Sequence, residues 1–172
     1  MKKLIFIIIF TAFSSAYAID QDSLYSIWSD SSQEDTTRIN ANDKFVNLVF
    51  SGAVQVSVDS AITLSDELER FSVSKNNSEG TIAACNNLIL AFAHKGYVDK
   101  CKKLVTKSLN LCKNIDFEIG KATVYYNLAI AYYIQSNYEK SIENYEKSLL
   151  KFKKIKANSR VSGTLNNLGT VY

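Results

Sequence analysis

The dipeptide Asn-Leu recurs along this 172-residue chain at a fixed interval of forty residues. It stands at Asn47-Leu48, Asn87-Leu88, Asn127-Leu128 and Asn167-Leu168. Aromatic residues keep the same interval, because Phe92, Tyr132 and Tyr172 each follow one of the last three leucines by four places. A fixed period of this size marks an array of similar units, none of which buries its apolar face alone. The sequence therefore predicts a repeat protein.

Each unit is expected to consist of a helix, a turn and a second helix. Apolar residues follow helical spacing along two successive segments. The first stripe consists of Ala84, Leu88, Ala91 and Phe92, and the second of Val98, Cys101, Leu104, Val105, Leu109 and Cys112. Turns are expected at residues 95–97 and 135–137, where Gly96 or Asn137 can take the left-handed conformation that ends a helix. The predicted fold class is all-α, an α-solenoid of antiparallel helix pairs.

The paired helices of the third unit carry a pattern of aromatic and small residues. The first helix has Tyr125, Leu128, Ala129 and Tyr132, and the second has Ser141, Tyr145 and Ser148. This order, an aromatic, a leucine, a small residue and an aromatic, then a small residue, an aromatic and a small residue, resembles the tetratricopeptide repeat. The resemblance extends over 35–172, although Ile89, Cys101 and Gly52 depart from the family pattern. The family usually repeats every thirty-four residues or so. The longer period of forty resembles that of an extended subclass of the family. The resemblance implies a superhelix in which the first helices line a concave groove.

The first eighteen residues are interpreted as an export signal. Lys2 and Lys3 precede an apolar run, and the segment ends on Ala16-Tyr17-Ala18, the small-x-small form of a signal-peptidase site. The alternative is a membrane anchor, but about ten apolar residues span only ~15 Å of helix, half of a ~30 Å hydrocarbon core. We therefore expect an exported protein, periplasmic or extracellular. Residues 19–35 are expected to form a flexible leader whose Trp28 can lie over the first repeat, and residues 36–172 the array.

The last residues, 166–172, have the pattern of the first helix of a fourth unit. A solenoid needs a polar terminal cap, and this segment ends on the packing aromatic Tyr172 instead. We therefore expect about three and a half repeats here, with the array continuing in a longer protein. More repeats, a transmembrane helix and an effector domain all stay open as continuations.

Charge and cysteine content argue against several kinds of site. Removal of the signal leaves 18 basic against 17 acidic residues, and the densest basic stretch, 147–156, shares its predicted helix with apolar residues. This is typical of a solvated face and not of a nucleic-acid site. The cysteines Cys85, Cys101 and Cys112 are interpreted as core residues, because the last two lie ~16 Å apart on one helix, too far for a disulfide. Metal and cofactor binding are not expected, since His94 has no second ligand at helical spacing.

Catalysis is not predicted either, because no nucleophile is accompanied by a base and an orienting acid. The period indicates a binding surface instead. Since the first helices line the groove in the family, their asparagines should project into it from helices ~10 Å apart, facing solvent and pairing with the backbone of an extended peptide. The candidate groove residues are Asn47, Asn87, Asn127 and Asn167, flanked by Val46, Phe50, Leu90, Tyr126, Ile130 and Tyr133.

Several alternatives remain at this stage. Each asparagine could instead bond to the adjacent unit and fix its stacking. The groove lacks the lysine or arginine pair with which resembling proteins clamp a terminal carboxylate, which argues against a peptide C-terminus as ligand. The leading hypothesis is a non-enzymatic module that binds a protein or peptide partner, with no nucleic acid and with a membrane only through a segment beyond Tyr172. The alternatives are the extracytoplasmic sensor region of a membrane-bound signalling protein such as a histidine kinase, and a carbohydrate-capturing surface protein.

Overall fold

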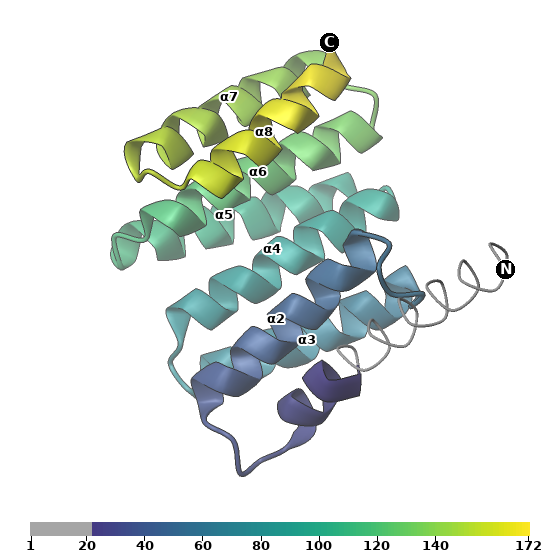
Figure 1. Ribbon diagram of the computed structural model, residues 1–172, viewed down its shortest axis with the longest axis vertical. Helices are drawn as coiled ribbons and strands as arrows, with labels where there is room; N and C mark the ends of the chain where they lie inside the picture. Colours follow the sequence, from purple (N-terminus) through teal and green to yellow (C-terminus); the bar gives the residue numbers. More distant parts are fainter. Residues whose placement is uncertain (1–21) are drawn as a thin grey trace, which may run out of the picture.

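The computed structural model describes residues 22–172, which form an array of helix pairs (Figure 1). A short helical segment, 22–29, precedes the array. The helices of the array are α2 (Asp35–Phe50), α3 (Val58–Ser74), α4 (Ser78–His94), α5 (Val98–Asn114), α6 (Glu118–Ile134), α7 (Tyr138–Lys154) and α8 (Asn158–Val171). Over 22–172 no residue lies in a strand. The predicted all-α fold of antiparallel helix pairs is therefore confirmed.

The forty-residue period fixes where the helices begin. α4, α6 and α8 begin at Ser78, Glu118 and Asn158, and the intervening helices keep the same interval. The helices α2, α4 and α6 contact one another in sequence and lie on one face of the array, while α3, α5 and α7 lie behind them (Figure 1). Each unit therefore presents its first helix to the same face.

The turns have a period of twenty residues, because each helix from α3 to α7 ends in the same way. Five residues with positive φ follow these helices, namely Asn76, Gly96, Asp116, Ser136 and Lys156. After α4, Tyr97 N–H donates to the carbonyl of Phe92 at 2.8 Å, and Gly96 N–H to that of Ala93 at 3.0 Å. This pair of bonds is the Schellman motif, which satisfies the last carbonyls of a helix.

One detail of the predicted turns is wrong. Ser136, and not Asn137, takes the left-handed conformation after α6, with φ of 57°. Asn137 is instead the N-cap of α7, where its side chain accepts a hydrogen bond from Lys140 N–H at 3.3 Å. An amide oxygen at this position satisfies one of the free N–H groups of the first turn, so Asn137 starts a helix and does not end one.

Small residues allow the paired helices to approach closely. Ser141 Oγ, which is fully buried, donates to the carbonyl of Ala129 at 2.9 Å, and so joins α7 to α6. One period earlier, Cys101 Sγ donates to the carbonyl of Ile89 at 3.4 Å. Each small donor thus bonds to a carbonyl of the facing helix, at equivalent positions of two units.

The cysteines are core residues, as predicted. Cys85, Cys101 and Cys112 are all buried, and none forms a disulfide. Burial raises the pKa of the Cys85 and Cys112 thiols to about 11. Because thiolates are the reactive form of cysteine, these two side chains are inert at neutral pH.

The leader is ordered over the part that the structure describes. Leu24 and Trp28 are buried, and the Trp28 ring meets the edge of Phe71 at a centroid separation of 5.3 Å. Arg38 Nε donates to the carbonyl of Trp28 at 3.0 Å, and its guanidinium lies over Phe71. Trp28 thus lies over the first repeat, as expected, and residues 22–29 are helical.

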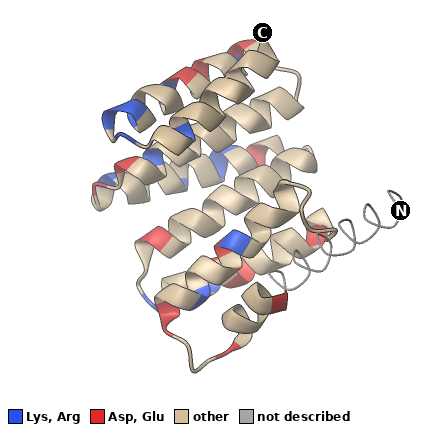
Figure 2. Cartoon of the chain, in the orientation of Figure 1, with Lys and Arg blue, Asp and Glu red and all other residues tan. Residues whose placement is uncertain are grey.

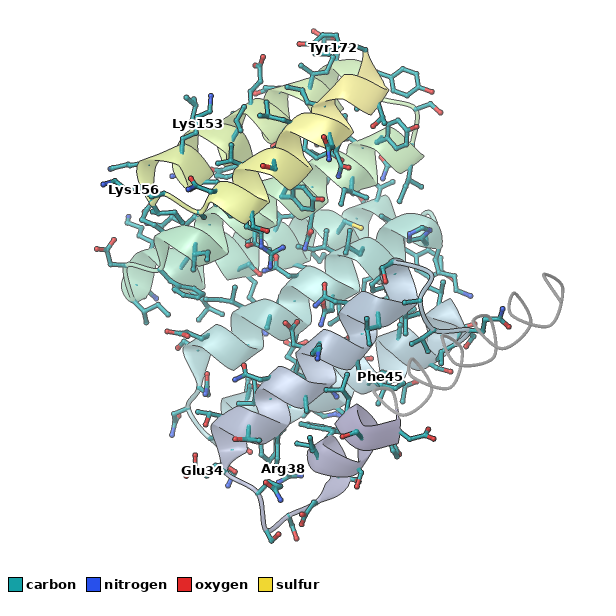
Figure 3. All side chains as sticks on the ribbon, viewed as in Figure 1. Glu34, Arg38, Phe45, Lys153, Lys156 and Tyr172 are labelled. Atoms are coloured by element: carbon teal, nitrogen blue, oxygen red, sulfur yellow. The ribbon has the colours of Figure 1, made fainter. Side chains whose placement is uncertain are left out.

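The predicted export signal, residues 1–18, lies outside the described residues. Among residues 22–172, no helix combines the length and the apolar character that a membrane crossing requires. Charged side chains of both signs are spread over the helices (Figure 2). The lysines at the end of α7, among them Lys153 and Lys156, are exposed (Figure 3), while Phe152 beside them is buried. This is the solvated face that the sequence predicted.

Candidate binding groove

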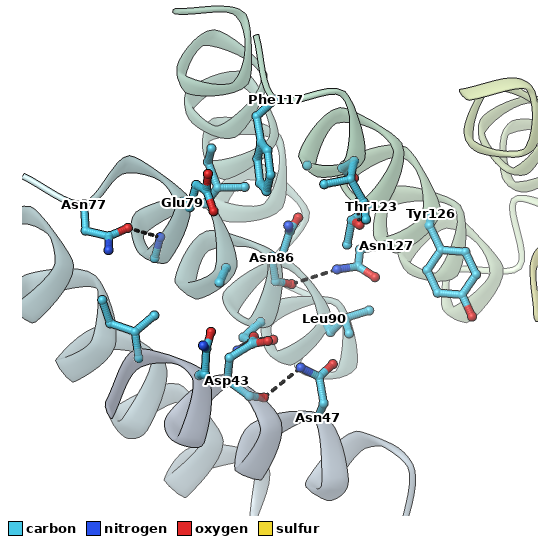
Figure 4. A pocket seen from close by; sticks show the side chains of 18 of the residues that line it. Asp43, Asn47, Asn77, Glu79, Asn86, Leu90, Phe117, Thr123, Tyr126 and Asn127 are labelled. Atoms are coloured by element: carbon cyan, nitrogen blue, oxygen red, sulfur yellow. Dashed lines mark hydrogen bonds between the residues drawn. The ribbon is translucent and has the colours of Figure 1, made fainter. Parts of the chain in front are cut away.

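A groove of about 480 Å³ lies along the first helices of successive units (Figure 4). Its walls come from α2, α4 and α6, and Arg160 at the start of α8 closes the lining. The lining residues recur at intervals of forty. Three sets show this, namely Asn40, Gly80, Gly120 and Arg160; Asp43, Ala83 and Thr123; and Asn47, Asn87 and Asn127. The period therefore brings one face of each first helix into a single groove.

Two glycines bring helix backbone into the groove wall. A Cβ added at Gly120 would lie 2.3 Å from a ring atom of Phe117 and 2.9 Å from Cys112 Sγ. At Gly80 it would lie 2.5 Å from Ser72 Oγ. All three distances are shorter than van der Waals contact. Only glycine therefore allows the first turns of α4 and α6 to pack this closely.

The asparagines bridge successive units. Asn87 Nδ2 donates to Asp43 Oδ1 at 2.9 Å, from α4 to α2. Asn127 Nδ2 donates to the carbonyl of Asn86 at 3.3 Å, from α6 to α4 (Figure 4). Asn167 Nδ2 donates to the hydroxyl of Tyr126 at 2.8 Å, from α8 to α6. The three bonds join the first helices of neighbouring units. They agree with the alternative in which each asparagine bonds to the adjacent unit and fixes its stacking.

The expectation that these amides face solvent is wrong for two of them. Asn87 is 2% exposed and Asn127 6% exposed. An amide that is buried between two helices must find a partner, because an unpaired buried donor is costly. Asn47 differs, because it lies on α2, the first helix of the array among residues 22–172. It is exposed, and its Nδ2 donates to the carbonyl of Asp43 in its own helix at 2.7 Å.

The predicted flanking residues are divided between the groove and other places. Leu90 and Tyr126 line the groove together with Asn47, Asn87 and Asn127. Tyr133 packs on Tyr138 at the turn into α7, with ring centroids 5.9 Å apart, and Phe50 stacks on His94 at 5.8 Å. Ile130 is half-buried on α6, and neither it nor Asn167 belongs to the groove lining. Val46 is fully buried in the core of the first unit, so its prediction as a flank is wrong.

Asp43 is a groove residue that the sequence analysis missed. Burial raises the pKa of its carboxyl above the ordinary value, although the hydrogen bond from Asn87 and the charge of Arg160 act in the opposite direction. Within the described residues this carboxylate forms no ion pair. A signal was present, because the period aligns Asp43 with Ala83, Thr123 and Gly163. Of these four equivalent positions, only that of the first unit carries an acidic residue, which indicates that Asp43 differs from its counterparts.

Asp43→Asn is expected to raise the stability of the chain at pH 7. Folding raises the pKa of Asp43. Ionisation of this carboxyl therefore lowers the stability of the folded chain as the pH rises from the unfolded pKa of about 3.9 through the folded pKa. Asparagine keeps an acceptor for Asn87 and removes the buried charge. Urea midpoints of both proteins should differ at pH 7 and converge near pH 3, or about one unit below that unfolded pKa. A variant that is less stable than the wild type at pH 7 would contradict this account of Asp43.

Metal chemistry finds no support in the part of the chain that the structure covers. In residues 22–172, no group of three or more His, Cys, Asp and Glu side chains could hold a metal ion. The groove is lined instead by amides, hydroxyls, short apolar side chains and a few charges. Such a lining can hold a ligand by hydrogen bonds and contact.

Residues 81–154 match the profile of the tetratricopeptide repeat. The matched stretch runs from the first turn of α4 to the end of α7, which is two complete helix pairs. The match supports assignment of the helix pairs α4–α5 and α6–α7 to the tetratricopeptide repeat. Tetratricopeptide repeats generally mediate protein–protein interactions, and the fold is typically a non-catalytic scaffold.

One solved structure supports the same fold over nearly the whole chain. The crystal structure of BtubC (BKLC) from P. vanneervenii is similar with a TM-score of 0.60 and 19% sequence identity. The similarity covers 94% of this chain, which spans 65% of the length of BtubC. At this identity the likeness concerns the fold alone. No curated protein matches the chain.

Proposed function

We propose that this tetratricopeptide repeat chain binds an extended segment of a partner protein in the groove over α2, α4 and α6. The observation that carries the proposal is the recurrence of lining residues at intervals of forty, which makes one continuous groove from three helices. Its volume of about 480 Å³ falls within the usual range of ligand sites, roughly 300–1,000 Å³. Neighbouring helices lie about 10 Å apart and an extended chain rises about 3.3 Å per residue. A segment of about six residues therefore crosses all three helices.

The chemistry of the lining favours a peptide. Asn40 and Asn47 are exposed on α2, and each amide offers donors and an acceptor to a peptide backbone. Leu90, Phe117 and Tyr126 supply apolar contact along the same path (Figure 4). The donors of Asn87 and Asn127 are already engaged between helices. We infer that these two hold the groove in shape, while the exposed amides contact the partner.

A bulky residue in the groove is expected to weaken binding strongly. Thr123 lies in the groove on α6 and donates its hydroxyl to the carbonyl of Ile119, four residues earlier, at 3.0 Å. Thr123→Trp would fill the groove and weaken binding at least tenfold. The probe is the heptapeptide most enriched from a phage-displayed random library selected on the wild type, and its affinity is measured by fluorescence anisotropy.

The chain offers a matched control for this variant. Thr106 is exposed on α5, on the opposite face, and donates to the carbonyl of Lys102 at 3.1 Å in the same local arrangement. Thr106→Trp should leave the affinity unchanged. Equal affinities of the two variants, or a selection that enriches no peptide, would place the binding surface elsewhere.

For the location of the protein we propose export, supported by Lys2, Lys3, the apolar run and Ala16-Tyr17-Ala18. Expression of the full chain in a bacterium should give a mature protein outside the cytoplasm, with Ile19 as its first residue. Fractionation and N-terminal sequencing measure both. A chain that stays in the membrane fraction with Met1 intact would favour the anchor instead.

A further inference from the structure

The groove carries an unusual charge at its floor. Asp43 is half-buried on α2, and its side chain lies beside Asn47 and Leu90 in Figure 4. Its Oδ1 accepts a hydrogen bond from Asn87 Nδ2 at 2.9 Å, which is a neutral donor. Within residues 22–172 no cation lies within ion-pair distance of this carboxylate. A part-buried carboxylate with only neutral donors leaves much of its charge uncompensated.

A second acceptor in the groove wall has no hydrogen-bond donor at all within residues 22–172. Asn86 on α4 is 6% exposed, lines the groove and lies beside Asn127 (Figure 4). Its Oδ1 is buried and has no hydrogen-bond partner among the described residues. Buried polar atoms are nearly always paired, so one that is not paired needs an explanation. A ligand rich in N–H donors would provide one.

The charges around the groove favour the same kind of ligand. Glu79 adds a second carboxylate at the start of α4, whereas Arg160 of α8 is the one cation that residues 22–172 contribute to the lining of this groove. Arg160 lies too far from Asp43 for an ion pair, although its charge lowers the pKa of that carboxyl. The groove therefore offers acceptors and negative charge over most of its length.

We propose that the groove selects partner segments that carry an arginine or lysine, and that the charged end of this side chain pairs with Asp43. The inference rests on the proposed function, since it names what the bound segment must contain. Arginine and lysine supply only donors, and charge-assisted hydrogen bonds to a carboxylate are stronger than neutral ones. The aliphatic stem of the side chain can pack on Leu90, as long cationic side chains do on apolar surfaces. An acidic side chain in the same place would meet like charges from Asp43 and Glu79, which lowers affinity.

The test uses the phage-displayed random heptapeptide library and the full chain. Selection on the wild type should enrich peptides with an arginine or lysine. For the most enriched peptide, replacement of its basic residue by glutamine should weaken binding to the wild type about tenfold. In Asp43→Asn the same replacement should change the affinity less than twofold, because the charge that reads the basic residue is gone. Thermal melting of Asp43→Asn by circular dichroism establishes that the variant is folded.

A second variant removes the positive charge in the groove instead of the negative one. Arg160→Gln removes the cation that shares the groove with Asp43, so it should strengthen binding of the basic peptide about threefold and leave its glutamine version within twofold. This variant also keeps the test decisive if Asp43→Asn does not fold. An affinity that stays constant or falls in Arg160→Gln counts against the proposal.

The possible failures are distinguishable. If the enriched peptides contain no basic residue but Thr123→Trp fails to bind them, this inference is overturned and the groove remains the binding site. A preference for arginine that persists in Asp43→Asn would also overturn it, because the reading group would then be another carboxylate. If the library yields no peptide whose binding Thr123→Trp removes, the inference falls together with the proposed function.

Discussion

Ser141→Phe is expected to lower the free energy of unfolding by about 3 kcal/mol. Ser141 is fully buried where α7 crosses α6, and its Oγ lies 2.9 Å from the carbonyl oxygen of Ala129. A phenyl ring cannot fit into this contact unless the two helices move apart. The substitution also removes the donor and leaves that carbonyl with one hydrogen bond fewer. Urea denaturation followed by circular dichroism measures the loss.

Two further variants separate the contributions to this loss. Ser141→Ala keeps the close approach of the helices and removes only the hydrogen bond, so it should cost about 1 kcal/mol. Glu146→Phe places the same ring on the exposed face of α7 and should change stability by less than about 0.5 kcal/mol. A Ser141→Phe protein that unfolds at the same urea concentration as Glu146→Phe would mean that α6 and α7 do not pack through this residue.

The contact between Ser141 and Ala129 shows what the sequence could predict. The period of forty places every residue in its unit, and helical spacing then indicates which positions face the paired helix. These two regularities were sufficient for the helix pairs, the small residues between them and the buried cysteines. They depend on local pattern alone, and a repeat array multiplies that pattern several times.

The partners of the asparagines could not be predicted in this way. Asn87 bonds to a carboxylate, Asn127 to a main-chain carbonyl and Asn167 to a phenol. The period shows that the three positions are equivalent, but their acceptors are three different groups on the preceding helix. An acceptor such as Asp43 occurs in only one unit, so its role depends on the packing of α2 against α4 and not on the repeat.

The turns show a similar limit. Among the five residues with left-handed backbone after α3 to α7, Gly96, Asn76 and Asp116 are of types that enter this conformation readily. The other two, Ser136 and Lys156, carry no such signal. Left-handed backbone at a residue such as Lys156 costs roughly 1–2 kcal/mol, and the two Schellman hydrogen bonds and the packing of the next helix offset it. The array therefore imposes the turn on residues whose own preference is weak.

The double variant Asn87→Ala, Asn127→Ala is expected to lower the free energy of unfolding by about 2–4 kcal/mol. The larger share comes from Asn87, because its hydrogen bond goes to the charged carboxylate of Asp43, and such bonds contribute about 1.5–3 kcal/mol. Asn127 adds the smaller contribution of a neutral bond to the carbonyl of Asn86. Both losses weaken the contacts between successive first helices. Asn47→Ala is the matched control, because Asn47 is exposed and bonds within its own helix, so its loss should change stability by less than about 0.5 kcal/mol.

Binding measurements on the same proteins distinguish stacking from peptide recognition. If Asn87 and Asn127 serve only to join successive helices, the double variant, at a temperature where it is folded, should bind the library-selected peptide within about threefold of the wild type, or about 0.6 kcal/mol. Asn47→Ala should weaken binding more than that despite its unchanged stability, because its amide is exposed in the groove and can contact the peptide. The opposite pattern, with the melting temperature of the double variant unchanged and its affinity reduced more than tenfold, would show that the buried amides turn towards the ligand. The hydrogen bonds between α2, α4 and α6 would then exist only in the empty groove, and the partner segment would replace them.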